Sequence, residues 1–472
     1  MFSMLARKRS RVGQEISAGD LMNLPVEMRE EIFKYLSRRE LLDACLVSYT
    51  WNEMIGNSIA FKTKVPISIH PWSRNKQKKS KYISNSIRSY DTFSISNFEA
   101  GPEVIFFSSK IWKRASIQIE IFPSKADFIK YIKYFSENIR DLKILNTHIA
   151  KTDSTEKLSL PCLEVLEFSS VPVMAVEPFV SCHNKLKSLY LKYMYESPFN
   201  AELMTSTLIQ LFELNNTIKD LELHADVSNE LFKKDISDNV HFELKTLTLC
   251  SDYDRARDDI IQDNMLKFIK SQAKSVEHLK FVFRHHPEHN QANHWFVNPR
   301  GRSNPEGKDF LIILKIWNDM TKLKKLAIRF MKACEITEEE PELLKNMIIN
   351  ININELHIQF ENCDENYPWK YLKAIIKVSP NVETIKIRHL YTDLLQYLAL
   401  NMFKLKFINC DTFDNGTLSF YETMKTSEKR LNSFIIIKGF ECEPVQLNNN
   451  NNNNGFDQVW WVEDDVVFHN EL

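Results

Sequence analysis

Four histidines stand close together in one polar stretch of the chain. They are His285, His286, His289 and His294. The first three form an HHxxH pattern, and because imidazole nitrogen is a common zinc ligand, a metal site is one interpretation. No paired cysteine accompanies them, and Pro287 and Pro299 are typical of a loop. We therefore favour a polar insertion loop near residues 285–308 and predict no metal site.

The usual signatures of catalysis do not occur. The chain has 472 residues but only 9 glycines, so it is poor in the residue from which phosphate-binding loops are built. It contains no GxGxxG, GxxxxGK[ST], HExxH or GxSxG pattern. Its 8 cysteines show no CxxC spacing, which argues against a zinc ribbon or thioredoxin-type site and is typical of a reducing compartment. We predict no catalytic residues, no cofactor and no enzymatic activity.

The composition narrows the class of protein further. Hydrophobic residues make up 43% and charged residues 26%, and the net charge is −1, so no overall field selects nucleic acid or an acidic membrane as partner. The first residues lack the apolar core of a secretory signal, and no apolar run is long enough to span a bilayer. We expect a cytoplasmic or nuclear protein. Residues 7–11, RKRSR, are either a nuclear address or an ordinary basic terminus.

After a flexible basic N-terminus (1–20), residues 21–61 are predicted to form three short helices. Pro25 suits the first turn of a helix, with Met28, Ile32, Tyr35 and Leu36 on one face. An S-x-x-E capping box at Ser37 starts the second helix. Val47, Trp51, Met54 and Ile55 repeat the one-face spacing in the third. This much apolar surface exceeds what three short helices can cover, so part of it is expected to pack against another surface. Packing on the rest of the chain is the alternative.

These residues resemble the F-box, a pattern of roughly LPxE(I/M)…IFx(Y/H)L…(D/E)L…(A/C)…VCxxW. The matches are Leu24-Pro25, Glu27-Met28, Ile32-Phe33, Tyr35-Leu36, Leu41-Leu42, Cys45, Val47 and Trp51. Ser48 replaces a cysteine that many members have. The resemblance implies docking on a Skp-family adaptor and, through it, on a cullin–RING ubiquitin ligase. The adaptor contacts that it implies are Leu24, Pro25, Ile32, Leu36, Leu41, Leu42, Val47 and Trp51, with Trp51 alternatively packed inside the F-box.

Residues 62–114 show no clear period and are interpreted as a connector with an irregular first repeat, with strands at Val104–Phe107 and Ile117–Ile121. From about residue 115 to 447 an apolar-x-x-apolar-x-apolar unit recurs. Its instances are Ile139/Leu142/Ile144, Leu163/Leu166/Phe168, Leu186/Leu189/Leu191, Ile218/Leu221/Leu223, Leu244/Leu247/Leu249, Val276/Leu279/Phe281, Leu323/Leu326/Ile328, Ile353/Leu356/Ile358, Val382/Ile385/Ile387, Met402/Leu405/Phe407 and Leu431/Phe434/Ile436. The spacing, mostly 20–32 residues with one of 47, is similar to that of leucine-rich repeats, although the asparagine that usually follows the strand is mostly absent.

Several spacers between these units are amphipathic. Phe128, Ile129, Ile132 and Phe135 share a helix face, and similar faces occur in residues 261–269, 372–376 and 394–398. Ser124 and Asp393 are candidate N-caps. A strand followed by a helix, stacked in this way, predicts an α/β fold: a curved leucine-rich-repeat-like solenoid behind a three-helix F-box. A βα-rich globular domain with accidental periodicity is the alternative.

In such strands the residues between the apolar positions face the concave surface, because side chains alternate. The early strands would present mixed charges and the late strands mainly basic ones, a pattern that indicates a receptor surface for an acidic or phosphorylated segment or, alternatively, an ordinary solvated face. The candidate target-binding residues are Tyr190, Lys280, Lys325, Arg329, Lys386, Arg388, Lys404 and Lys406.

The chain ends in an unusual tail. Residues 448–454 are seven asparagines, a linker, and residues 455–472 place Glu463, Asp464 and Asp465 among apolar side chains. We expect the tail to fold back, either capping the solenoid or occupying its basic surface. Together the features predict the substrate-recognition subunit of an SCF-type ubiquitin ligase that binds an unidentified target protein. A non-degradative F-box scaffold is the second hypothesis, and an enzyme hidden in the solenoid is the third.

Overall fold

The computed structural model describes residues 24–57, 67–69, 92–99, 113–133, 138–182, 185–195, 201–252, 259–284, 315–330, 345–360, 368–413, 417 and 436–439. The predicted strand Val104–Phe107, the histidine-rich insertion and the C-terminal tail lie outside these residues.

The N-terminal module has three helices. They are α3 (Val26–Lys34), α4 (Arg38–Val47) and α5 (Tyr49–Asn57). Ser37 caps α4 as the sequence predicts: its hydroxyl accepts from the Glu40 amide, and the Glu40 carboxylate accepts from the Ser37 amide.

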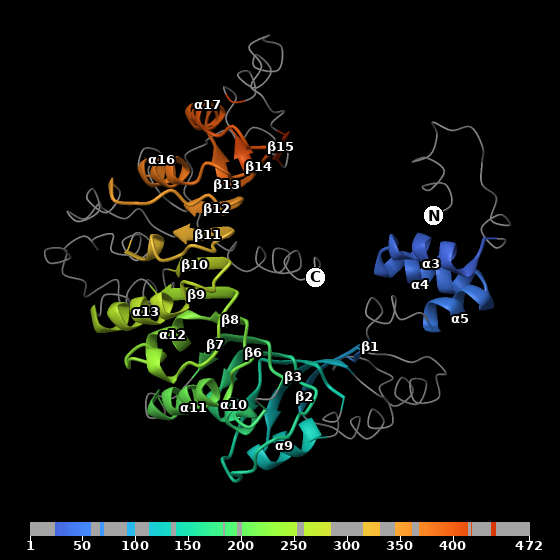
Figure 1. Ribbon diagram of the computed structural model, residues 1–472. Coiled ribbons are helices and arrows are strands. Elements are labelled where there is room, and N and C mark those ends of the chain that lie inside the picture. The colour runs from blue at the N-terminus through green and yellow to red at the C-terminus, as the bar shows by residue number, and fades with distance from the viewer. Residues whose placement is uncertain are drawn as a thin grey trace, which may run out of the picture.

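The remaining described residues contain one curved parallel sheet (Figure 1). Within the described residues it has 15 strands in the order β1-β2-β3-β4-β6-β7-β8-β9-β10-β11-β12-β13-β14-β15, with β5 paired to β3. The strands are β1 (Ile67–Ile69), β2 (Thr92–Glu99), β3 (Arg114–Phe122), β4 (Asp141–Leu145), β5 (His148–Ile149), β6 (Val165–Pro172), β7 (Ser188–Tyr195), β8 (Asp220–Leu223), β9 (Thr246–Asp252), β10 (His278–Arg284), β11 (Lys325–Phe330), β12 (Glu355–Phe360), β13 (Thr384–Leu390), β14 (Phe407–Phe413) and β15 (Ile436–Gly439). Sequence order and spatial order therefore agree along the array, as stacked repeats require.

Helices follow many of the strands and cover the outer side of the arc in Figure 1. They are α9 (Lys125–Lys133), α10 (Val173–Val176), the 3₁₀ helix η1 (Glu177–Phe179), α11 (Ala201–Leu214), α12 (Ala225–Leu231), η3 (Ser237–Asn239), α13 (Asp259–Gln272), α16 (Pro368–Val378) and α17 (Thr392–Asn401). The apolar faces predicted for the α13, α16 and α17 segments are buried, as are Phe128, Ile129 and Ile132 of α9. We call the opposite side of the sheet the concave face.

The apolar positions of the repeat form continuous buried rows. Leu142 of β4 is in register with Leu166 of β6, and the same row continues through Leu189, Leu221 and Leu247. Each of these side chains is no more than 1% exposed. The α/β solenoid predicted from the sequence is confirmed.

The sheet begins in the segment that was predicted as a connector with an irregular first repeat. The segment Ile117–Ile121 is a strand as predicted, within β3, and β1 and β2 precede it in the same sheet. Phe93 and Ile95 of β2 stand in register with Ala115 and Ile117. The periodicity was not visible there because these strands lie in a polar, basic stretch.

The end of the array corrects two of the predicted repeat units. β13 pairs with β14 so that Ile385 faces Ile408 and Ile387 faces Cys410. The unit is therefore Leu405/Ile408/Cys410, three residues later than predicted, and the register of β15 shifts the last unit by the same amount. Residues 402–410 satisfy the apolar pattern in both registers. Burial distinguishes the two registers, because Ile408 is fully buried whereas Phe407 is 39% exposed.

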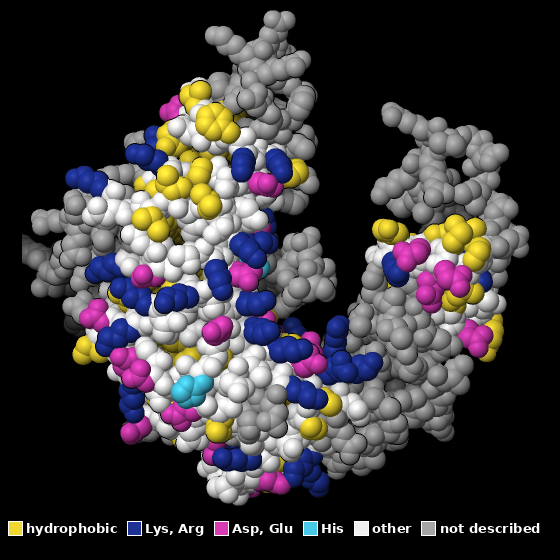
Figure 2. Space-filling model, in the orientation of Figure 1, with side chains coloured by type: hydrophobic (Ala, Val, Ile, Leu, Met, Phe, Trp, Pro, Cys, Tyr) yellow, Lys and Arg dark blue, Asp and Glu magenta, His cyan; other side chains and the backbone are white. Residues whose placement is uncertain are grey.

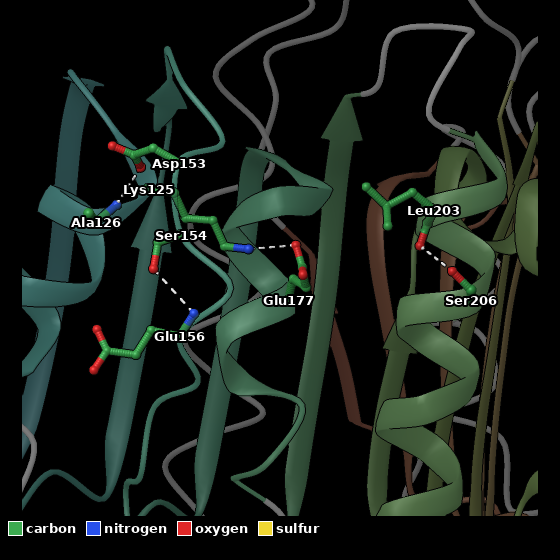
Figure 3. A network of polar contacts seen from close by, with 8 residues as sticks. All are labelled: Lys125, Ala126, Asp153, Ser154, Glu156, Glu177, Leu203 and Ser206. Atoms are coloured by element: carbon green, nitrogen blue, oxygen red, sulfur yellow. Dashed lines mark hydrogen bonds and ion pairs between the residues drawn. The ribbon is translucent and has the colours of Figure 1, made fainter.

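The start of α9 is fixed by a polar cluster (Figure 3). Ser124 caps the helix as predicted, since its hydroxyl accepts from the Asp127 amide at 3.1 Å. The Asp153 carboxylate accepts from the Ala126 amide at 3.1 Å, and the Lys125 ammonium contacts Glu177 of η1 at 2.6 Å. The predicted cap Asp393 was wrong: α17 begins at Thr392, and Tyr391, two residues earlier than Asp393, is its N-cap.

The pair Lys125–Glu177 is asymmetric, and this asymmetry generates a stability prediction. The Lys125 side chain is 3% exposed, whereas Glu177 is 36% exposed. Glu177→Gln leaves a buried ammonium without its counter-ion, and we expect it to lower the unfolding free energy by about 1–3 kcal/mol. Lys125→Met leaves only a carboxylate that water reaches, so it should cost about 1 kcal/mol or less. Apparent unfolding midpoints in urea measure the difference, and the opposite order of the two variants would contradict it.

Candidate functional site

The N-terminal module has a very small core. Five side chains form it: Phe33, Leu41, Ala44, Trp51 and Ile55. The Phe33 and Trp51 rings meet edge to face with their centroids 5.1 Å apart. Ser48, at the position where the pattern often has cysteine, accepts the Trp51 amide through its hydroxyl at 3.1 Å and so caps α5. The sequence analysis missed this role, although a serine three residues before the first buried residue of a helix is a cap signal.

A set of large apolar side chains remains exposed on the same module. They are Val26, Met28, Tyr35, Leu46, Val47 and Tyr49. Leu46 and Tyr35 are each 86% exposed. Met28 and Tyr35, which the sequence places on one face of the first helix, are both exposed, and Phe33 is the buried residue of α3. An exposed apolar set of this kind on a small module is typical of a protein interaction site.

The eight predicted adaptor contacts divide into three groups. Leu24, Ile32 and Leu36 are half-buried, and Pro25 and Val47 are exposed. Leu41 is fully buried and Trp51 is 6% exposed. Leu41 therefore belongs to the core rather than to the outer surface, and Trp51 packs inside, which is the alternative that the sequence left open. Leu42 lies in α4, and its side chain is not among those described.

The early part of the concave face holds a compensated network of charges. The Glu167 carboxylate contacts Lys143 of β4 at 2.8 Å and Lys192 of β7 at 3.4 Å. Lys192 also reaches Glu222 of β8 at 3.7 Å. The neighbouring lysines hold the pKa of Glu167 below its ordinary value despite burial, which acts in the other direction. Here cations and carboxylates neutralise one another.

Tyr190 lies between these carboxylates. Burial, followed by the negative charge of Asp220, raises the pKa of Tyr190 to about 12. Its phenol therefore stays protonated, and the ammonium of Lys192 lies 5.6 Å from the centre of its ring. Tyr190 can therefore act as a packing residue within the charge network as well as a contact for a target protein.

The late part of the concave face is cationic. Register places Lys280 (β10), Ala327 (β11), His357 (β12) and Lys386 (β13) side by side in one row. Arg329 lies two residues after Ala327 and so on the same face. At the other end of these strands Lys325 pairs with Glu355 at 3.0 Å. Figure 2 shows Lys and Arg side chains gathered along this side of the solenoid, with single acidic side chains between them.

Six of the eight candidate target-binding residues lie in strands of the sheet. Tyr190, Lys280, Lys325, Arg329, Lys386 and Arg388 take the alternating positions that face away from the buried rows. Lys404 and Lys406 do not, because the register of β14 puts both before the strand. Lys406 instead contacts Glu383 at 2.9 Å. Asn409 takes the concave position that was assigned to Lys406.

The part of the chain that the structure describes contains no group of three His, Cys, Asp or Glu side chains able to hold a metal ion. None of the helices in these ranges has the length and apolarity needed to cross a membrane.

The pKa of His357 is lowered by burial and by the cationic row in which the residue lies. Burial, and then Lys386, Lys280 and Arg329, lower the pKa of His357 to about 4 from an ordinary value of 6.5. Between these pH values the unfolded chain binds a proton that the folded chain does not, so stability falls as the pH drops from about 6.5 to about 4. We expect His357→Gln to lose less stability than the wild type over this window, by up to roughly 3 kcal/mol. Urea unfolding at several pH values measures this, and parallel curves for the two proteins would contradict it.

One comparison with known proteins concerns the N-terminal module. The family model described as F-box-like matches residues 21–63. Among solved structures, the leucine-rich repeat-containing protein LegL7 from Legionella pneumophila is similar at 10% identity and a TM-score of 0.36, over 75% of this chain and 92% of that one. A comparison with curated proteins finds no match. The chain therefore carries an F-box-like domain at residues 21–63, and the α/β solenoid follows it in the sequence.

Proposed function

We propose that the chain is the substrate-recognition subunit of an SCF-type, cullin–RING ubiquitin ligase. The observation that carries the proposal is the exposed apolar set of the F-box-like domain. Fully burying one leucine or isoleucine stabilises a complex by about 1.5–3 kcal/mol. F-box domains generally bind Skp-family adaptors, and an adaptor would cover these side chains.

We infer the docking surface from the side chains of the module that are not fully buried. It comprises Leu24, Pro25, Ile32, Leu36 and Val47 from the family pattern, and we add the exposed Leu46 and Tyr49 at the junction of α4 and α5. Leu41 and Trp51 support this surface from within the core. Leu42 remains a candidate contact.

The solenoid is proposed to bind the target protein on its concave face. Its apolar residues form a core separate from that of the F-box-like domain. In this arrangement the chain holds a target near the conjugating enzyme, and the other subunits carry out the chemistry, so that no catalytic residue is required of the chain itself. The ligase works in the cytoplasm, the nucleus or both.

A non-degradative F-box scaffold is the second candidate. The same exposed apolar set favours it equally, because adaptor binding is common to both functions. Co-purification of a cullin subunit, together with accumulation of the target when the protein is depleted, supports the ligase. Adaptor binding without either result supports the scaffold.

The docking surface predicts the effect of two substitutions on adaptor binding. Leu46→Asp places a charge on a side chain that is 86% exposed, and Leu24→Ala with Pro25→Ala removes the edge of the family pattern. Each should weaken binding to a purified Skp-family adaptor by at least about tenfold, because an apolar contact is lost or a charge is desolvated. Calorimetric titration measures the affinity.

Leu400→Asp is the matched control. Leu400 lies in α17 of the solenoid and is 73% exposed, so the substitution has the same chemistry on a surface outside the docking module. It should leave adaptor affinity unchanged. Equal affinity for the wild type and both docking variants would refute adaptor docking by this surface.

A further inference from the structure

Large apolar side chains are exposed at the edge of the sheet where the late strands begin. Five of them are between 51% and 75% exposed: Ile348, Ile349, Ile351, Leu400 and Phe403. The three isoleucines precede β12, Leu400 lies near the end of α17, and Phe403 precedes β14. We call these five side chains the apolar edge. Figure 2 shows apolar side chains gathered at this end of the solenoid, over α16 and α17.

Register brings the two halves of the apolar edge together. The first residues of β12, β13 and β14 pair with one another, and Ile351 and Phe403 each stand four residues before their strand. Two strand spacings, roughly 10 Å, therefore separate them. Pro380, at the same distance before β13, is exposed between them. The Asn381 side chain donates to the Ile351 carbonyl at 2.7 Å, so the loops before β12 and β13 are in direct contact.

The stack does not require apolar side chains at this edge. Four residues before β8, β10 and β11 stand Asn216, Lys274 and Thr321, which are exposed and polar. The corresponding residue before β9, Phe242, is buried. An exposed apolar set confined to the late repeats is typical of a surface that another segment covers.

The backbone that carries the apolar edge is held in place. The Ile348 amide donates to the Asn318 side chain at 2.9 Å, and its carbonyl accepts from the Trp317 indole at 2.9 Å. The Asn350 amide donates to the carbonyl of Val378 in α16 at 2.7 Å. Because these side chains are already positioned, a segment that covers them orders little of the solenoid when it binds.

We propose that the C-terminal tail, residues 455–472, docks on the apolar edge. This inference does not depend on adaptor docking. The tail places Glu463, Asp464 and Asp465 between two apolar runs, residues 459–462 and 466–468. Its apolar side chains would be buried against the edge, at about 25 cal/mol for each Å² removed from water.

Charge favours the edge over the late concave face as the place where the tail docks. Lys377, near the end of α16, and Lys404, next to Phe403, are exposed beside the apolar edge. These ammonium groups can attract the acidic residues of the tail while its apolar runs pack on the edge. On the late concave face the lysines would attract the acidic residues alone. The edge thus suits both kinds of side chain in the tail.

The length of the chain allows the tail to reach the edge. Gly439 of β15 pairs with Cys410 of β14, which lies seven residues after Phe403, so Gly439 and Phe403 are at most roughly 25 Å apart. Residues 440–454 precede the tail. Fifteen residues span about 20 Å by random-coil scaling and about 50 Å when extended. A connection of matching length keeps the effective concentration of the tail at the edge high.

A second copy of the chain suits the same edge less well. A symmetric contact would bring equivalent surfaces together and place Lys377 and Lys404 of both chains near one another. Like charges at close range oppose such a contact. The acidic tail has the opposite charge.

Photo-crosslinking in the full chain tests the proposal. The benzophenone amino acid p-benzoylphenylalanine replaces Gln458 in the tail, and the peptides joined to it after irradiation are identified by mass spectrometry. We expect cross-links within one chain to residues 345–354 and 396–407. The same irradiation in concentrated urea gives the background of the unfolded chain.

Two sets of variants show whether the apolar edge causes the cross-links. Leu400→Asp with Phe403→Asp should lower their yield by at least about fivefold, because two carboxylates replace apolar contacts and repel the acidic tail. Ile351→Asp changes the other half of the edge with one substitution and should also lower the yield. Leu214→Asp is the matched control: Leu214 ends α11, before β8, and is 48% exposed. It should change the yield by less than about twofold.

Four outcomes would overturn the proposal. Cross-links mainly to β10–β13 would place the tail on the concave face, and cross-links that join two chains, seen as a doubled mass, would assign the edge to a second copy. A yield no higher than in urea, or an equal yield in the wild type and the edge variants, would show that the tail does not dock there. Far-ultraviolet circular dichroism establishes that each variant is folded.

Discussion

The structure depends on one constraint: each repeat buries its apolar side chains only by standing in register with its neighbours. The row from Leu142 to Leu247 is fully buried although a single strand has no partner for it within its own repeat. The backbone obeys the same constraint. In the consecutive strands from β4 to β14, β5 apart, the amide of the residue before the strand donates to the carbonyl of its counterpart one repeat earlier, as Lys187 does to Glu164 at 2.8 Å and Lys406 to Glu383 at 2.8 Å. The stack is strong enough to impose left-handed backbone at equivalent positions, since Ser170 and Tyr193 have φ of 55° and 49°, at a cost of roughly 1–2 kcal/mol per residue.

Because the buried apolar rows hold the repeats together, the side chains at the alternating positions are not needed for stacking. These side chains can differ from repeat to repeat without loss of the fold, and the two parts of the concave face carry different ones. At β4 to β8 the alternating positions carry paired charges, so that part of the face is nearly neutral. At β10 to β13 the same positions carry Lys280, Arg329 and Lys386. Such a change in side-chain charge along a uniform backbone suits a recognition surface, because the shape of the face stays constant while its charge determines which partner binds.

Much of this architecture could be predicted from the sequence because the apolar unit recurs many times along the chain. The capping box at Ser37 and the N-cap at Ser124 were predicted from local residue patterns. The errors have physical causes. Residues 402–410 contain two overlapping apolar patterns, and only pairing with β13 decides between them. β2 buries Phe93 and Ile95, but the polar residues around this short strand conceal its apolar alternation in the sequence. Leu41 matches the family pattern, but whether such a leucine faces a partner or the core depends on how α4 packs against Phe33 and Trp51, which spacing alone does not show.

The size of the F-box-like core links its stability to its partner. The module buries five side chains within the described residues, whereas the solenoid buries rows that run through the whole stack. Modules below about 40 residues seldom bury enough apolar surface to be stable alone. A partner that covers Leu46, Val47 and Tyr49 would therefore supply part of the folding free energy of the module as well as a docking contact. A substitution at these exposed positions removes the contact but leaves the core intact, while one at Leu41 or Trp51 removes both. Since the two cores are separate, neither kind of change needs to alter the rows that shape the concave face.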